Sequence, residues 1–213
     1  MATWRVERIA GSAGVLHDRD IPSPLTPTVW VFTVDRPALV LGSTQPDDIV
    51  DRAAARDAGV EVARRRSGGG AVWLEPHGTS WVDVLVPRGH RLWDDDVGRA
   101  VYWLGEAWAA AVGLVADVHR GGMVCTAESG RACFAGLGPG EVTIGGRKAV
   151  GISQRRTRAG ARFQCVAYER WDPSPLVRLL QLSPDAAEAL DEVGTGLGAG
   201  LRDLEEGLLE RLP

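Results

Sequence analysis

Short hydrophobic runs, separated by turn residues, recur along most of the chain, and their composition predicts strands. The runs are rich in β-branched and aromatic side chains, and glycine, proline or aspartate stands close to most of their ends. The predicted strands cover residues 29–33, 38–41, 60–65, 71–74, 81–86, 141–144, 149–153 and 161–168. Gly145 and Gly146 stand between two of these runs and predict a hairpin turn.

Two other segments place hydrophobic residues at the spacing of a helix. The first begins at Asp47, whose side chain suits a helix N-terminus, and it ends at Gly59. The second begins with the three aspartates at 94–96, interpreted as a helix cap rather than a magnesium site, and it ends at Gly113. Its hydrophobic positions form one stripe: Val97, Val101, Leu104, Trp108 and Val112.

The order of these elements predicts an α+β fold. Strands stand before and after the central helix, and this order favours a mixed or antiparallel sheet flanked by helices. Residues 173–213 predict a tail of short helices, interrupted by the glycines between 194 and 200. A chain of 213 residues suits one domain, 1–213, with a sizeable core.

Composition and charge narrow the class of protein. A formal net charge of −4 argues against a nucleic-acid or anionic-membrane partner. No segment approaches the roughly 20 apolar residues of a membrane span. The three cysteines form no CxxC pair and no even disulfide set, which predicts reduced thiols and a cytoplasmic protein. His17, His90 and His119 have no partners at metal-ligand spacing, so we predict no metal site.

Lys148 is the only lysine among the 24 basic residues; all the others are arginine. In a chain that otherwise uses arginine for positive charge, a surviving lysine indicates a position where arginine is not suitable. The lysine ammonium is compact and fits between several oxygens, whereas guanidinium is a wide planar fork. The alternative is chance, but the neighbouring glycines let backbone approach a ligand closely. Lys148 is therefore the first candidate site residue.

The strongest local motif is a glycine-rich segment that follows three arginines. It comprises Arg64, Arg65, Arg66, Ser67, Gly68, Gly69, Gly70 and Ala71. Three consecutive glycines leave backbone N–H groups uncovered, and such a row of amides binds anions. Side chains alternate along a strand, so either Arg65 or the pair Arg64 and Arg66 faces a phosphate or carboxylate ligand. The alternative is a flexible hairpin with a solvated basic flank.

Two motifs in this order resemble the lipoate–protein ligase and octanoyltransferase family. The first runs from Arg64 to Val72, and the second, at 146–156, reads Gly-Arg-Lys-x-x-Gly-x-x-Gln-x-Arg. The segment 38–45, which ends in Gly-x-x-Gln, is also similar to the family, and the resemblance covers about residues 28–170. It implies a catalytic domain of the biotin/lipoate protein ligase type that transfers a medium-chain acyl group to one lysine of a carrier domain.

The resemblance also implies roles for individual residues. Lys148 would contact the activated carbonyl or phosphate, and the glycine-rich segment would line the acyl and nucleotide pocket. Gly146, Gly151 and Ser153, in the second motif, are implied to belong to the same pocket. Trp73 and Trp81, which flank the hairpin, are expected near the acyl chain.

Cys133 distinguishes two branches of the family. Cysteine-dependent octanoyltransferases are similar to this chain in carrying Cys-Phe fifteen residues before the motif lysine, where Cys133 and Phe134 stand. A thiol there would accept the acyl group from an acyl carrier protein and pass it to the target lysine. The alternative is that Cys133 is a small buried hydrophobic residue.

The chain departs from the family at three places. Cys165 stands where the family commonly has a histidine, so the sequence predicts a second pocket thiol beside Cys133. Gly78 and Thr79, preceded by His77, replace the family's Gly-Asn. These residues are retained as acyl- or nucleotide-binding candidates, with His77 also interpretable as a turn residue. The tail is too short for the accessory C-terminal domain of many lipoate ligases, which counts against a self-sufficient ligase.

Three functions follow as hypotheses. The leading one is a lipoate/octanoate protein acyltransferase that acts through a thioester on Cys133, with Lys148 as an electrostatic clamp. The alternative is an ATP-dependent lipoate–protein ligase that forms lipoyl-AMP and requires magnesium. The third is a non-catalytic binder of lipoate or a related acid. The expected partners are a lipoyl carrier domain or a glycine-cleavage H-type protein, and an acyl carrier protein as donor.

Overall fold

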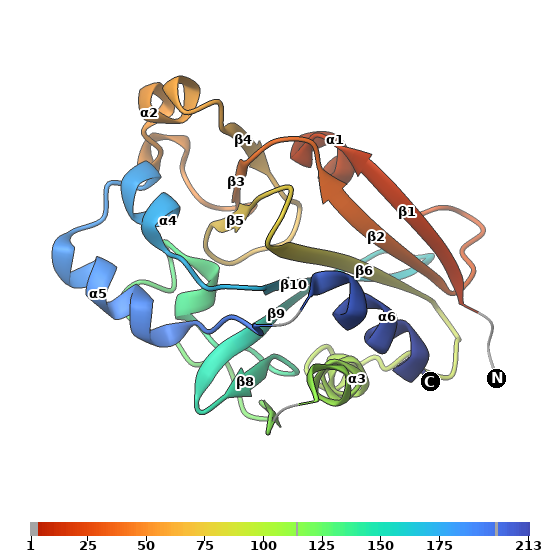
Figure 1. The fold of residues 1–213 in the computed structure, drawn as a ribbon. Coiled ribbons are helices and arrows are strands. Elements are labelled where there is room, and N and C mark those ends of the chain that lie inside the picture. Colours follow the sequence, from red (N-terminus) through yellow and green to blue (C-terminus); the bar gives the residue numbers. More distant parts are fainter. Residues whose placement is uncertain (1–3, 114, 199) are drawn as a thin grey trace.

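The computed structural model describes residues 4–113, 115–198 and 200–213, and these residues form ten strands and six α-helices (Figure 1). The strands are β1 (Arg5–Gly11), β2 (Thr28–Val34), β3 (Ala38–Leu41), β4 (Glu61–Arg64), β5 (Val72–Leu74), β6 (Thr79–Pro87), β7 (Asp117–Val118), β8 (Val142–Ile144), β9 (Arg147–Arg156) and β10 (Gly160–Tyr168). The helices are α1 (Ala13–Asp18), α2 (Arg52–Asp57), α3 (Tyr102–Val112), α4 (Ser174–Leu179), α5 (Pro184–Val193) and α6 (Leu201–Arg211).

The strands divide between two sheets. The large sheet has the order β1-β2-β6-β10-β9-β8-β7, and the small sheet has the order β4-β3-β5. Each sheet contains one parallel pair, β1 with β2 and β3 with β4, and the other pairs are antiparallel. The predicted α+β class with a mixed sheet is therefore confirmed, with the strands shared between two sheets.

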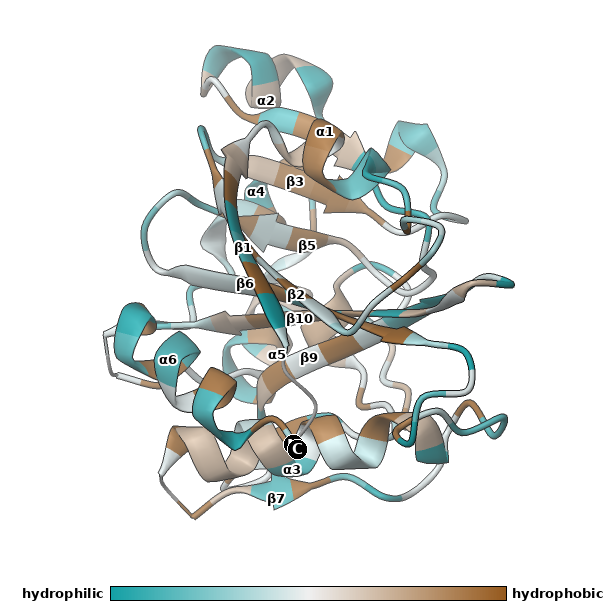
Figure 2. Ribbon diagram, turned by 90° about the vertical axis from the view of Figure 1, so that its right-hand side faces the viewer, coloured by the Kyte–Doolittle hydropathy of each residue, from teal (hydrophilic) through white to brown (hydrophobic). Residues whose placement is uncertain are grey.

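The two sheets stack between helical layers. Helices α3 and α6 cover one face of the large sheet, and the other face packs against the small sheet and α1. The outer face of the small sheet packs against α2, α4 and α5. Figure 2 shows hydrophobic residues along β3 and β9, which lie between the layers, and hydrophilic residues on α2 and α6, which lie on the outside. No helix in the described part of the chain combines the length and apolar character needed to cross a membrane.

Both predicted helices begin later than the sequence suggested. Asp51, rather than Asp47, caps α2, because its side chain accepts the Ala54 amide at 2.9 Å. The acidic run at 94–96 precedes a short 3₁₀ turn, Arg99–Val101, and only then does α3 begin. The helix ends as predicted at Gly113, which has a left-handed φ of 67°.

The strands β1 and β7 and the helix α1 were not predicted from the sequence. β1 is an edge strand with a largely exposed surface, and it pairs in parallel with β2 across the connection that contains α1. α1 has only six residues, too few for a recognisable helical stripe. This omission matters, because α1 carries a residue of the site.

Candidate active site

Lys148 lies at the start of β9, after the turn formed by Gly145 and Gly146, and its side chain is buried. Its Nζ donates to Glu141 Oε2 at 2.8 Å and to the backbone oxygens of Cys133 and Gly136 at 3.0 Å each. An ammonium group has three N–H donors, so these contacts occupy all of them. A planar guanidinium could not reproduce this compact three-way arrangement, which gives a structural reason for the single lysine.

Lys148 borders a cavity, but its side chain is buried, so the residue also contributes to the stability of the fold. Only 3% of the residue surface is exposed, and its partner Glu141 is also buried. Removing Lys148 would leave an unpaired carboxylate inside the protein, which is destabilising.

Lys148 is charged at neutral pH. Burial on its own would lower the pKa of Lys148, but the Cys133 thiolate and the Glu141 carboxylate oppose burial, and the net pKa is raised. The ammonium stands 4.0 Å from Cys133 Sγ. The cysteine sulfur therefore lies beside a fixed positive charge.

Cys133 opens a short 3₁₀ turn, Cys133–Ala135, which is docked on the glycine-rich segment. The Cys133 amide donates to the Ala71 oxygen at 2.9 Å, and the Ala71 amide donates to the Arg131 oxygen at 2.8 Å. Ala71 thus acts through its backbone, and its side chain is buried. Cys133 itself is half-buried, so the thiol is held firmly but remains accessible.

Gly68, Gly69 and Gly70 border the cavity that contains Cys133. Within the described residues, no hydrogen bond involves the amide N–H of any of the three. Gly69 has a φ of 93°, which favours glycine, and a Cβ on Gly70 would lie 2.5 Å from the Ala132 carbonyl carbon. The glycines therefore let a row of free amides approach the cysteine segment, and such amides can stabilise a developing oxyanion.

The three arginines alternate in direction, as a strand requires. Arg65 is buried beside Cys133 and donates to the backbone oxygens of Gly68 and Gly70 at 2.7 and 2.8 Å. Burial lowers the pKa of Arg65, and the Cys133 thiolate opposes this shift. Arg64 and Arg66 point the other way: Arg64 contacts Asp47, and Arg66 contacts aspartates of the α1 region. Of the three, only Arg65 lines the cavities around Cys133.

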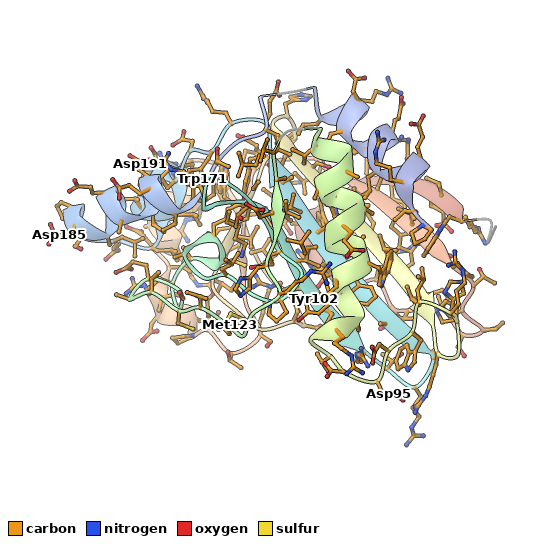
Figure 3. The ribbon with its side chains drawn as sticks, turned by 90° about the horizontal axis from the view of Figure 1, so that it is seen from below. Asp95, Tyr102, Met123, Trp171, Asp185 and Asp191 are labelled. Atoms are coloured by element: carbon orange, nitrogen blue, oxygen red, sulfur yellow. The ribbon has the colours of Figure 1, made fainter. Side chains whose placement is uncertain are left out.

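Two cavities meet at Cys133, Ile152 and Ser153, which line both of them. The outer cavity has a volume of about 560 Å³ and contains the glycine-rich segment, Lys148 and Glu141. Met123 also lines it, together with Val101, which directly precedes α3; Met123 and Tyr102 are labelled in Figure 3.

The inner cavity is narrow, about 30 Å³, and lies between the two sheets. Its walls are mainly apolar: Val40, Val72, Leu74, Trp81, Phe134, Ile152 and Val166. Gly151 lies on its wall beside Phe134, and because glycine has no side chain, this part of the wall stays open. Trp81 thus lies where an acyl chain is expected, whereas Trp73 packs on the opposite side of the small sheet.

Cys165 is not a pocket residue, contrary to the sequence-based expectation. It lies on the face of β10 that packs against α3, fully buried among hydrophobic residues. Burial also raises its pKa strongly, so it is a poor nucleophile. Side chains alternate along β10, and the neighbouring Gln164 and Val166 face the inner cavity instead. The second thiol that lines the outer cavity is the exposed Cys125.

Other sequence candidates also lie away from the cavities. His77 and Gly78 lie in the turn between β5 and β6, Thr79 begins β6, and none of the three lines either cavity at Cys133. Gly146 is exposed in the β8–β9 turn, where its φ of 79° serves the hairpin. Its contribution is to aim Lys148. Among the described residues, no group of three or more His, Cys, Asp or Glu side chains could hold a metal ion.

The sequence analysis missed three polar residues of the site: Glu141, Gln164 and His17. Glu141 accepts the Gly138 amide as well as Lys148, through the same oxygen, and its other oxygen accepts the Ile152 amide at 3.0 Å. An acidic residue that opens a hydrophobic strand seven positions before the lysine was an available signal. His17 had no comparable signal, because it comes from a helix remote in sequence.

Comparison with known proteins identifies the family. The family model described as "Lipoyl protein ligase A/B catalytic domain" matches residues 15–208. The chain belongs to this family. It is therefore an enzyme domain of the lipoyl ligase and transferase type, and the match extends well beyond residues 28–170 that carry the sequence motifs. Comparison with curated proteins gives no match.

Solved structures show the same fold. A bi-partite lipoate protein ligase from Thermoplasma acidophilum, studied with its E2 lipoyl domain, is 15% identical with a TM-score of 0.75, covering 99% of this chain and 82% of that one. A lipoate-protein ligase A bound with ATP is 15% identical with a TM-score of 0.69, covering 97% and 83%. LipL1 of P. falciparum in complex with lipoate is 12% identical with a TM-score of 0.61, covering 98% and 59%.

Proposed function

We propose that this enzyme transfers an octanoyl or lipoyl group to a lysine of a carrier domain through a thioester on Cys133. The observation that supports this most directly is the Lys148 ammonium, held by three acceptors at 4.0 Å from Cys133 Sγ. A fixed cation beside a half-buried thiol at the junction of two cavities is the environment of a reactive cysteine.

The reaction divides into two acyl transfers. The Cys133 thiolate attacks the carbonyl carbon of an acyl thioester, the new C–S bond forms, and the donor thiol leaves with the proton that Cys133 gave up. The carrier amine then attacks the acyl-Cys133 carbonyl, the amide C–N bond forms, and the cysteine thiol is regenerated with a proton from the amine. The free amides of Gly68–Gly70 are placed to stabilise the oxyanion of each tetrahedral intermediate.

The partners follow from this chemistry. The acyl donor is an acyl carrier protein, and the acceptor is a lipoyl carrier domain or an H-type protein of glycine cleavage. A T. acidophilum ligase of the same fold was studied together with an E2 lipoyl domain, which supports an acceptor of this kind. Since the mechanism requires a reduced thiol, we place the enzyme in the cytoplasm.

The second candidate is an ATP-dependent ligase that forms lipoyl-AMP. A neighbour of the same fold binds ATP, and the outer cavity combines free amides with the buried Arg65 nearby, which suits a phosphate. Magnesium would accompany the nucleotide in that case.

Intact-mass analysis separates these mechanisms. The enzyme is incubated with an octanoyl-carrier thioester or with lipoate plus ATP and magnesium, followed by a lipoyl domain. We expect transfer from the thioester without ATP, lost in Cys133→Ser and retained in Cys125→Ser and Cys165→Ala. Transfer by Cys133→Ser only in the presence of ATP would establish the ligase and exclude the thioester mechanism.

A further inference from the structure

We propose that His17 and Gln164 form a polar recognition site on the inner cavity wall, which selects an acyl chain with heteroatoms at its far end over a plain hydrocarbon chain. The substrate class is then lipoyl rather than octanoyl. This inference rests on the proposed function, because it assigns the chemistry of the acyl group that the same site transfers.

The position of His17 relative to Cys133 comes from the sheet order. Cys133 contacts Lys148 on β9, whereas His17 packs on Trp81 of β6, with β10 between the two strands. Adjacent strands lie about 4.8 Å apart, so the cavity extends across roughly 10 Å of sheet from the thiol to His17. A chain attached to Cys133 and directed into this cavity therefore brings its far end toward His17.

Hydrogen bonds define which atom His17 presents to the cavity. Ser67 Oγ donates to Gln164 Oε1 at 3.1 Å, and Gln164 Nε2 lies 3.2 Å from His17 Nδ1. An amide nitrogen can only donate, so Nδ1 is the acceptor and the ring proton is on Nε2. Within the described residues, His17 Nε2 has no hydrogen-bond partner. His17 lines the inner cavity and is only 7% exposed, so this N–H is a donor available to a bound chain.

The imidazole is fixed in place and neutral. Its ring packs on Trp81 with a centroid distance of 4.2 Å. Arg162 donates to the backbone oxygens of Leu16, His17 and Arg19, and thereby ties the end of α1 to the large sheet. Burial, followed by the charges of Arg162 and Arg65, lowers the pKa of His17 well below its usual range.

The polar wall disfavours a purely hydrocarbon end group. A methyl group placed against the Nε2–H would leave a buried donor unsatisfied, which is unfavourable. The lipoyl group has the same eight-carbon chain as octanoyl, but its far end carries two sulfur atoms. Sulfur is a weak acceptor and also packs favourably against an aromatic ring such as Trp81. The cavity is narrow, so its apolar side chains must shift on binding, while His17 is held from three sides and stays as the selective contact.

Calorimetry on the protein tests this without relying on catalysis. The ligands are lipoate, octanoate and 8-hydroxyoctanoate, which places a single acceptor oxygen at the far carbon. We expect the wild type to bind lipoate and the hydroxy acid roughly tenfold more tightly than octanoate, which is the size of one net hydrogen bond. His17→Phe keeps the aromatic packing and removes the donor, and should bring the three affinities within about twofold of one another. His90→Phe, remote from the cavity, should keep the wild-type preference.

The outcomes are distinct. Equal affinities, or tighter binding of octanoate by the wild type, would overturn the inference while leaving acyl transfer intact. An unchanged preference in His17→Phe would also overturn it. Failure of the wild type to bind any of the three acids would overturn this inference, whereas the proposed function is tested separately by acyl transfer from a carrier thioester. The wild-type comparison stands on its own should His17→Phe fail to fold.

Discussion

Two buried ion pairs lie on the large sheet, Lys148–Glu141 and Arg162–Asp83, and they use their charges differently. The first gathers three acceptors around one small ammonium beside the reactive thiol. The second spreads a planar guanidinium over Asp83, at 2.5 Å, and three backbone oxygens at the end of α1. Lysine suits a site where several acceptors converge on one point beside the reactive thiol. Arginine suits a site where the acceptors are spread out, and here it holds the end of α1 to the large sheet.

The comparison also explains what the sequence could and could not predict. Lys148 was identifiable because it is the only lysine, and the glycine-rich segment because consecutive glycines are uncommon in strands. Arg162 is one of many arginines and carries no local signal. Its role depends on β10 pairing with β6 and on α1 lying above both, which are long-range contacts.

Cys165 shows a different limit. Family resemblance correctly marked a position on β10 but not the direction in which its side chain points. The alternation of the strand places Cys165 toward α3 and gives the cavity to Gln164 and Val166. The strands β3, β4 and β5 were predicted, but their assembly into a separate sheet over this face was not, so the side of β10 that meets the pocket could not be decided from the sequence.

Removing the contacts of Arg162 with Asp83 and with the end of α1 should have the largest effect on stability. Arg162→Leu leaves Asp83 fully buried without its partner, and we expect a loss of about 3–5 kcal/mol in the free energy of unfolding. Urea denaturation followed by tryptophan fluorescence measures this. The double variant Arg162→Leu, Asp83→Leu should recover much of the loss, because no unpaired charge remains. If the single variant were as stable as the wild type, the contacts of Arg162 would be dispensable for the fold.

Replacing the convergent lysine should slow the reaction strongly. Lys148→Arg keeps a positive charge but cannot place it among the same three acceptors. We expect the rate of Cys133 acylation to fall by about 10²–10³, the typical cost of losing one preorganised electrostatic group. Single-turnover mass spectrometry measures the rate. Near-native turnover of Lys148→Arg would refute the distinction drawn between the two pairs.

Disturbing the contact between Gly70 and the segment that contains Cys133 should have a smaller effect on stability and on the acylation rate. A Cβ at Gly70 would approach the Ala132 carbonyl carbon to 2.5 Å, so Gly70→Ala should cost about 1–3 kcal/mol of stability and slow acylation by displacing Cys133. Gly68→Ala is the matched control, since nothing lies within 4 Å of its Cβ. Thermal unfolding and acylation rates should separate the two variants, and equal behaviour would argue against a tight contact.

The smallest expected effect is a pH dependence of stability from His17. Its pKa is lowered in the native state, so the unfolded chain binds the proton more readily below the ordinary value of 6.5. Stability should therefore decrease as the pH falls below 6.5, and His17→Phe should reduce that decrease. His90, whose pKa is also lowered by burial, contributes in the same direction in both proteins. Urea unfolding above about pH 5, where ordinary carboxylates remain ionised, would show the difference. An identical pH profile for both proteins would contradict a buried neutral His17.

The most direct test of the account is to locate the acyl group on the enzyme during turnover. The wild type is mixed with an octanoyl or lipoyl carrier thioester without ATP, quenched in acid and digested, and the peptides are analysed by mass spectrometry before and after treatment with neutral hydroxylamine. We predict one acyl group, sensitive to hydroxylamine, on the peptide that contains Cys133, and its loss when a lipoyl domain is added. An unmodified Cys133 peptide, together with carrier modification that depends on ATP, would contradict the account.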